Sequence, residues 1–260
     1  MKQTFKGKVI KMKVIFNADD FGYSKGVNLG ILEAYKNGVL RSTTIMAGMP
    51  GFEHAVNLSK ENPGLRIGVH LTLTTGKSVG GIYKTLTDED GKFLPLNEVE
   101  RRAKAGETDL AEVEAEYEAQ IRKVLAAGIN PDHFDSHHHT HNLPGIVNVF
   151  LKMAKKYGVK VRIYDKELLK GEYADVRTTD EFIDTFFGDT VTAEDLLGML
   201  SSCKAETVEV MCHPAYMDKF LHESSSYSMK RVYELDVLTS SEVKDYVDEH
   251  GIESVSFSDF

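Results

Sequence analysis

Four histidines fall within five consecutive positions, in the segment His-His-His-Thr-His at residues 137–141. Protonated imidazoles at this spacing repel one another, and neutral ones are costly to bury without partners. Metal binding is a physical reason to gather them, because neutral imidazole is a good ligand for divalent ions. On an extended backbone His137, His139 and His141 would share one face, whereas on a helical turn His137 and His141 would meet. The residues predict a metal site and leave its liganding nitrogens open.

Two adjacent carboxylates, Asp19 and Asp20, follow the apolar run at residues 14–16. Neighbouring side chains on a strand point to opposite faces, but at a strand end that turns into a loop both can face one cavity. One carboxylate could then bind a metal ion while the other accepts a proton from water. The alternative is a pair that satisfies amides at the start of the helix near Ser24. Taken alone, the pair favours this structural role.

Two further histidines lie at the ends of predicted strands. His70 follows the run 67–69, and His213 is followed by Pro214. A lone histidine at such a place is more often a hydrogen-bonded core residue than a metal ligand. Proline restricts the residue before it to extended conformations, so the imidazole of His213 would be held rigidly. A core histidine bonded to a neighbouring carboxylate is an equal alternative for His213.

Strands and helices alternate along the chain. Apolar runs predict strands over residues 14–16, 42–46, 67–71, 133–134, 159–164, 207–212 and 254–257, and helical periodicity predicts helices over 27–35, 109–127 and 146–157 with two more near the C-terminus. Residues 75–98 are expected to form a long loop. Strands separated by helices imply parallel β/α units, which fit a doubly wound sheet or a barrel. A barrel is favoured, because four predicted strands end in Asp or His and a barrel gathers these ends at one mouth.

The composition limits the class of protein. The 260 residues are 42% hydrophobic, with no repeat or long linker, so one domain with a sizeable core is expected. With 31 Lys and Arg against 40 Asp and Glu, the net charge of −9 disfavours binding to nucleic acid or to an anionic membrane. No apolar run approaches the ~20 residues of a membrane span. Only two cysteines occur, Cys203 and Cys212, which excludes a disulfide scaffold. Reduced thiols are expected instead, and a cytoplasmic protein is therefore predicted.

One family accounts for all of these sites together. The segments are 17–26 (NADDFGYSKG), 68–74 (GVHLTLT), 135–141 (DSHHHTH) and 212–216 (CHPAY), supported by Ser225-Ser226-Tyr227, Arg231 and Glu234-Leu235. In these motifs the chain resembles the YdjC-like carbohydrate deacetylases, which include chitooligosaccharide deacetylases of bacterial sugar-utilisation operons. The resemblance runs from about residue 12 to residue 260. We interpret residues 1–11 as an N-terminal extension that forms an added strand or an interface segment.

The resemblance implies an irregular TIM-like (β/α) barrel as a single domain over residues 1–260, with a divalent metal ion, Mg or Zn, held by one aspartate and two histidines. Carried onto this chain, the metal ligands are Asp20, His70 and His137. His141 is the reserve ligand, because related polysaccharide deacetylases use a histidine pair four residues apart. The same resemblance makes Asp19 the general base and His213 the general acid.

The resemblance implies that the protein is a hydrolase of carbohydrate metabolism. It would remove the N-acetyl group from amino sugars or from short N-acetylated oligosaccharides, and these substrates could be phosphorylated or unphosphorylated. Two alternatives stay open: a metal-dependent hydrolase that cleaves a phosphorylated disaccharide, and a non-catalytic protein that binds sugar or metal. The expected partner is a small sugar, and the N-terminal extension makes a homodimer plausible. Arg162 could bind sugar hydroxyls or a phosphate and Tyr216 could stack on a sugar face, although each is as consistent with a structural role.

Overall fold

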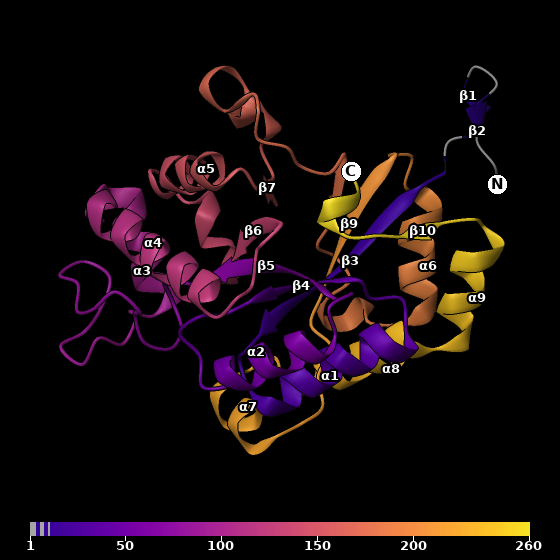
Figure 1. The fold of residues 1–260 in the computed structure, drawn as a ribbon, viewed down its shortest axis with the longest axis horizontal. Coiled ribbons are helices and arrows are strands. Elements are labelled where there is room, and N and C mark those ends of the chain that lie inside the picture. Colours follow the sequence, from indigo (N-terminus) through magenta and orange to yellow (C-terminus); the bar gives the residue numbers. More distant parts are fainter. Residues whose placement is uncertain (1–3, 6–7, 10) are drawn as a thin grey trace.

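A curved parallel sheet runs through the computed structural model, which describes residues 4–5, 8–9 and 11–260 (Figure 1). Neighbouring strands along the sheet are, in order, β7 (Lys160–Val161), β6 (His133–Ser136), β5 (Arg66–Leu71), β4 (Ser42–Ile45), β3 (Lys13–Phe21), β9 (Thr207–Cys212) and β8 (Glu181–Ile183). β10 (Glu253–Ser254) pairs with β3, and all of these pairings are parallel. Within the described residues β7 and β8 do not pair. The predicted barrel of β/α units is therefore confirmed in an open, irregular form.

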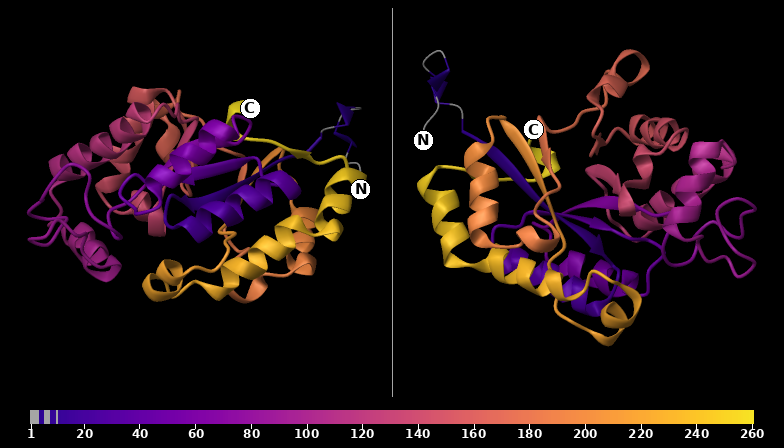
Figure 2. Two further views of the ribbon diagram at one scale, coloured as in Figure 1. Left: turned by 60° about the horizontal axis from the view of Figure 1, so that its bottom comes forward. Right: turned by 180° about the vertical axis from the view of Figure 1, so that it is seen from behind.

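Helices cover the outside of this sheet. The α-helices are α1 (Lys25–Asn37), α2 (Phe52–Glu61), α3 (Leu96–Ala105), α4 (Leu110–Ala126), α5 (Ile146–Tyr157), α6 (Ala193–Ser202), α7 (Lys219–Ser224), α8 (Met229–Thr239) and α9 (Ser241–Glu249). The 3-10 helices are η1 (His137–Asn142), η2 (Lys166–Leu169), η3 (Gly171–Tyr173), η4 (Gly188–Thr190) and η5 (Phe257–Asp259). Figure 2 shows α1, α8 and α9 along one flank, and α4 and α5 on another.

Residues on both faces of the sheet are buried, as is usual for parallel strands. β3 is buried throughout after its first residue, and every residue of β4 and β6 is buried. Phe16, Val69, Phe134 and Val210 come from four different strands and belong to one hydrophobic core. This core fixes the strand ends at which the predicted site residues lie.

Several elements differ from the prediction. The strand predicted over 14–16 continues to Phe21, so that both aspartates lie within it. The strand predicted over 159–164 is only two residues long, and that over 254–257 ends at Ser254 before η5 begins. The helices α2, α3 and α6 and the three-residue strand β8 were not predicted. The long loop is confirmed in its position and ends where α3 begins at Leu96.

The N-terminal extension is described only in part. Residues Thr4–Phe5 (β1) and Lys8–Val9 (β2) pair in an antiparallel way, apart from the main sheet. The rest of residues 1–10 lies outside the described residues, so the interface role predicted for this segment stays a prediction. Among the described helices, none is both long and apolar enough to cross a membrane.

Candidate active site and metal centre

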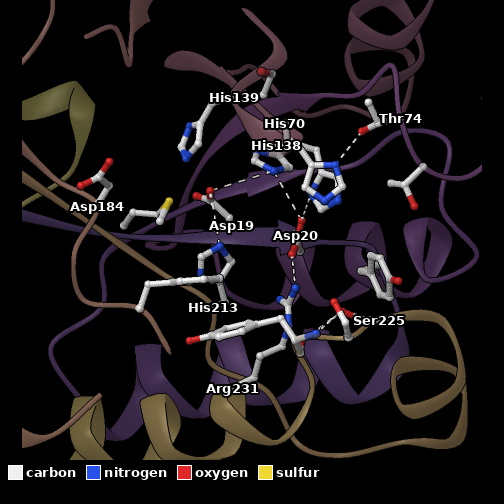
Figure 3. A pocket seen from close by; sticks show the side chains of 18 of the residues that line it. Asp19, Asp20, His70, Thr74, His138, His139, Asp184, His213, Ser225 and Arg231 are labelled. Atoms are coloured by element: carbon white, nitrogen blue, oxygen red, sulfur yellow. Dashed lines mark hydrogen bonds and ion pairs between the residues drawn. The ribbon is translucent and has the colours of Figure 1, made fainter. Parts of the chain in front are cut away.

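A pocket of about 570 Å³ opens where strands β3, β5, β6 and β9 end (Figure 3). Its lining includes all five residues predicted to act on the metal or the substrate bond: Asp19, Asp20, His70, His137 and His213. They come from four motifs that are spread over almost 200 positions of the sequence. The parallel strands bring them together, because their carboxyl ends meet at one edge of the sheet.

The two adjacent aspartates reach the same pocket because the strand is irregular between them. The register of β3 against β4 shifts between Ala18 and Phe21. Within this shift Asp20 adopts a left-handed backbone with φ of 71°, which is uncommon for any residue other than glycine and is found at functional sites. The alternative role at the start of a helix is not seen, because Ser24 caps α1 by accepting a hydrogen bond from Val27 N–H.

The turn after Asp20 is braced by a buried side chain. Gly22 has φ of 95° and donates its N–H to Asn28 Oδ1 at 2.6 Å. Asn28 in turn donates from Nδ2 to the carbonyl of Gly51 at 2.9 Å. Glycine suits this position, because a side chain is strained at positive φ. The strained turn that presents Asp20 is thus tied to α1 and to the loop before α2.

Asp20, His70 and His137 bring three ligand atoms within 4.8 Å of one another. Asp20 Oδ1 lies 2.9 Å from His137 Nδ1 and 3.4 Å from His70 Nε2. This oxygen is buried and has no hydrogen-bond partner among the described residues. One carboxylate oxygen and two imidazole nitrogens form a donor set that suits a divalent cation and leaves positions open for water and substrate. The residues therefore fit the metal that the sequence predicts.

Arg231 selects which oxygen of Asp20 faces the imidazoles. Its Nη2 donates to Asp20 Oδ2 at 2.7 Å, and its Nε donates to the carbonyl of Tyr227 at 2.7 Å. Burial alone would raise the pKa of Asp20, but Arg231 and His137 outweigh it and hold the pKa well below its usual value. Asp20 therefore stays ionised, with Oδ1 directed to the candidate metal position.

His70 is oriented by a second carboxylate. Its Nδ1 lies 2.7 Å from Asp135 Oδ1, which turns Nε2 toward Asp20. A carboxylate behind a metal-binding histidine commonly fixes its tautomer and ring direction. Burial lowers the pKa of His70, but Asp135 and Asp19 outweigh burial and raise the pKa to about 10. A divalent cation at Nε2 would supply the positive charge that a proton on the His70 ring otherwise provides beside these carboxylates.

The histidine segment is neither extended nor helical throughout. His138 and His139 both adopt left-handed backbones, with φ of 56° and 51°. Only His137 of this segment joins Asp20 and His70 in a group of possible metal ligands among the described residues.

The other histidines of the segment have different surroundings. His138 and His139 line the pocket, and the hydroxyl of Thr74 bonds with His138 Nδ1 at 2.9 Å. His141, the reserve ligand, is buried against Phe150, and its Nδ1 bonds with Ser136 Oγ at 2.6 Å. Burial holds the pKa of His141 well below its usual value, so it is a neutral core histidine.

Asp19 is held by a bidentate pair with a buried guanidinium. Arg162 Nη1 donates to Asp19 Oδ2 and Nη2 donates to Oδ1, each at 2.7 Å. The same Oδ2 lies 3.9 Å from His213 Nε2 and 4.0 Å from His70 Nε2. Burial would raise the pKa of Asp19, but Arg162 and the two histidines outweigh it, so the pKa lies well below its usual value. Asp19 is thus ionised and fixed between the candidate metal position and His213.

His213 stands on the other side of Asp19 (Figure 3). Its backbone N–H donates to Glu234, and its Nδ1 lies 3.6 Å from Glu234 Oε1. Glu234 also accepts a hydrogen bond from the Tyr227 hydroxyl at 2.5 Å. The neighbouring carboxylate fits the structural alternative for His213, yet the ring lines the pocket and directs Nε2 toward Asp19. The geometry accommodates an orienting carboxylate behind a proton donor.

Arg162 and Tyr216, the two residues considered for sugar contacts, are placed elsewhere. Arg162 is completely buried and pairs with Asp19, Asp135 and Glu209. Tyr216 is 45% exposed but is not among the residues that line the pocket. Neither side chain is therefore placed to touch a sugar in this pocket.

Several residues of the site were given no role by the sequence. Asp135 and Glu234 stand behind His70 and His213 and do not line the pocket. Both lie within segments that carry the family resemblance, so their positions offered a signal. Tyr164, Asp184 and Phe187 line the pocket from loops that carry no motif.

Comparisons with known protein sequences identify relatives of this chain. The family described as YdjC-like protein matches residues 13–249. A carbohydrate deacetylase of Clostridium beijerinckii is 40% identical over 250 residues, which cover 95% of this chain and all of that protein. A carbohydrate deacetylase of Listeria monocytogenes serotype 4a is 44% identical with the same coverage.

Solved structures show the same arrangement of elements. A protein of Enterococcus faecalis V583 described as a "putative cellobiose-phosphate cleavage protein" superposes with a TM-score of 0.88 and 37% identity, over 95% of this chain and 98% of that one. A family 4 carbohydrate esterase of Streptomyces lividans superposes with a TM-score of 0.51 and 12% identity, over 93% of this chain and 90% of that one. At this low identity the second likeness concerns the fold alone.

Proposed function

This chain belongs to the YdjC-like protein family, and from that premise we propose that it is a metal-dependent carbohydrate deacetylase. Its substrate would be an N-acetylated amino sugar or a short N-acetylated oligosaccharide. The observation that carries the proposal is the placement of Asp19 Oδ2, which lies 3.9 Å from His213 Nε2 and 4.0 Å from His70 Nε2. A base that stands between a metal position and a possible proton donor suits the metal-assisted hydrolysis of an amide.

The metal ion would be held by Asp20, His70 and His137, whose ligand atoms already converge. A bound divalent ion supplies a Lewis acid that polarises the acetyl carbonyl and makes water more acidic. Mixed oxygen and nitrogen ligation is compatible with Mg and with Zn. Arg231 would keep Asp20 in place as a ligand through one oxygen, because it occupies the other.

The remaining chemistry belongs to the side chains around the ion. Asp19 accepts a proton from the attacking water while the new carbon–oxygen bond forms at the acetyl carbonyl. His213 Nε2 then donates a proton to the amine nitrogen as the carbon–nitrogen bond breaks, because an unprotonated amine is a poor leaving group. The products are acetate and the free amino sugar. Arg162 holds Asp19 in one orientation throughout, so that the same oxygen faces the water.

The first alternative is hydrolysis of a phosphorylated disaccharide, the activity that the description of the Enterococcus protein suggests for that protein. Among the described residues that line this pocket, Arg231 is the only lysine or arginine, and its guanidinium is bonded to Asp20 and to the carbonyl of Tyr227. A phosphate group would find no free protein cation there. This argues for the deacetylase. The second alternative, a non-catalytic binding protein, would need neither a general base nor a general acid, the roles for which Asp19 and His213 are placed.

The proposal is tested by acetate release from a panel of N-acetylated mono- and oligosaccharides, with and without phosphate, in the presence of added Mg or Zn. Acetate should appear together with one free amine per molecule, and a chelator should stop the reaction. Release of phosphate or of a new reducing end without acetate would favour the first alternative. Binding of sugar without any product would favour the second. The cytoplasmic location and the homodimer stay predictions, which cell fractionation and light scattering can test.

A further inference from the structure

Two exposed aromatic side chains stand at one wall of the pocket. Phe187 is 44% exposed and Tyr164 is 48% exposed, and both line the pocket. Tyr164 follows β7 and Phe187 follows β8, which are the two unpaired ends of the sheet. In the described part of the chain these two end strands do not pair with each other, but the ring of Tyr164 meets the ring of Phe182, in β8, at a centroid distance of 5.3 Å.

Phe187 is held rigidly beside the proposed proton donor. Its ring stacks on Tyr227 with a centroid distance of 4.0 Å and an angle of 15° between the planes. The N–H of Gly188 donates to the Tyr227 hydroxyl at 3.2 Å, which ties the loop to the same side chain. The edge of the Phe187 ring meets the His213 ring at a centroid distance of 5.6 Å. An apolar face is thus fixed next to the group that would protonate the sugar nitrogen.

Asp184 completes this wall with a hydrogen-bond acceptor. The hydroxyl of Tyr164 donates to Asp184 Oδ2 at 2.6 Å, while Oδ1 accepts no hydrogen bond from a described residue. Tyr164 also contacts the ring of His139, edge to face, at 5.5 Å. In the view of Figure 3, Asp184 lies across the pocket from Thr74 and Ser225, beyond Asp19. A carboxylate beside an aromatic face is a combination that binds sugar hydroxyls and the C–H face of a ring together.

From these contacts we propose that Tyr164, Asp184 and Phe187 form a subsite for an uncharged sugar ring. The inference rests on the proposed deacetylase function and adds to it which sugars the pocket prefers to bind. The sugar ring packs on Phe187, and its hydroxyls donate to Asp184 Oδ1. Phosphate is disfavoured there, because the subsite offers a carboxylate and no free cation, and like charges in contact cost binding energy. The rigid stacking of Phe187 on Tyr227 means that little side-chain freedom is lost when the sugar binds.

The first experiment measures binding of N,N′-diacetylchitobiose by calorimetry to the metal-loaded Asp19→Asn variant, in which turnover does not interfere. Adding Phe187→Ala should weaken this binding by about tenfold or more, because the apolar contact is lost. Phe187→Tyr should restore it. Tyr233→Ala is the matched control, since Tyr233 is 51% exposed and is not among the pocket-lining residues. Unchanged binding in Phe187→Ala, or an equal loss in Tyr233→Ala, would overturn the subsite.

The second experiment measures binding of N,N′-diacetylchitobiose and of its 6-phosphate derivative to the metal-loaded Asp19→Asn variant, with and without Asp184→Asn. Without Asp184→Asn the unphosphorylated sugar should bind more tightly than the phosphate, and adding Asp184→Asn should narrow the difference between the two affinities. Equal or tighter binding of the phosphate without Asp184→Asn, or a difference that Asp184→Asn leaves unchanged, contradicts the assignment. The outcomes distinguish a failure of the subsite proposal from a failure of the proposed function. If the wild type binds the disaccharide through Phe187 but releases no acetate, only the function fails; if it releases acetate and Phe187→Ala binds normally, only the subsite fails.

Discussion

Arg162 and Asp19 share two hydrogen bonds of 2.7 Å, one to each carboxylate oxygen, although 143 residues separate them in the sequence. Both side chains are buried. The neighbouring Asp20 is instead held through one oxygen only, by Arg231. This difference explains how two adjacent carboxylates can have different roles. Asp19 is fixed as a whole group, whereas Asp20 keeps Oδ1 free for a cation.

Arg162→Lys tests the positioning role of that pair. A lysine keeps the positive charge but cannot donate to both oxygens in the fixed geometry of a guanidinium. We expect kcat to fall on the order of 10²-fold, because a small displacement of the reacting groups has such an effect, while metal content stays normal. Steady-state kinetics and elemental analysis of the same preparation measure both. A parallel loss of metal would show that Arg162 supports the ion and not Asp19.

Arg162→Ala addresses stability. Asp19, Asp135 and Glu209 would then face one another without their shared cation. Removal of one partner from a buried ionic cluster typically costs about 3–5 kcal/mol of the free energy of unfolding. Urea denaturation followed by circular dichroism measures this change. A loss below about 1 kcal/mol, the scale of an exposed ion pair, would contradict the buried network described above.

The metal ligands are tested by alanine substitutions along the histidine segment. His70→Ala and His137→Ala should lose the bound ion, because each removes one of three protein ligands. His141→Ala should keep the ion and lose stability, since its imidazole packs on Phe150 and bonds with Ser136. Metal content after dialysis, and anomalous density in crystals soaked with Zn or Mn, measure the outcome. Density centred on His139 and His141 would refute the ligand assignment.

Much of the site was predictable because chemistry-bearing residues sit at the ends of strands. Asp19, Asp20, His70, His137 and His213 were each identified from the sequence, and the structure gathers them at one pocket. The choice among the histidines could not be made from spacing. It depends on the left-handed backbones of the two residues that follow His137, and no simple periodicity describes such a turn.

The partners of these residues were harder to foresee. For Arg162 the sequence left a contact to sugar or phosphate and a structural role equally open, and only the sheet order places it behind Asp19. The fold was predicted where apolar periodicity is strong, as in α4 and α5. It was missed in β8, which is three residues long and begins with Glu181. Phe187 and Asp184 follow this strand, so their part in the pocket was missed with it.

Asp19→Asn separates the base from the metal site. An amide cannot take the proton from water, so turnover should fall about 10²–10⁴-fold, the usual contribution of a general base. The ion should remain, because Asp20, His70 and His137 do not depend on Asp19 for their positions. Acetate release and metal content are measured side by side. If the ion is lost with the activity, Asp19 is itself a ligand.

His213→Ala tests the proton donor by the choice of leaving group. Hydrolysis of an N-acetyl sugar should slow much more than hydrolysis of an aryl acetate, because a phenolate departs without a proton and an amine does not. The bound ion should be retained. Rates on the two substrates at one pH give the ratio directly. Equal losses on both, together with loss of the ion, would make His213 a ligand or a structural residue.

The central claim is that this pocket removes an acetyl group from the nitrogen of a sugar. The most direct test incubates the metal-loaded protein with N,N′-diacetylchitobiose and counts acetate, free amine and new reducing ends in the same sample. The account predicts acetate and amine in equal amounts, no new reducing ends, and no reaction after treatment with a chelator. New reducing ends without acetate, or acetate release that the Asp19→Asn variant performs as fast as the wild type, would contradict it.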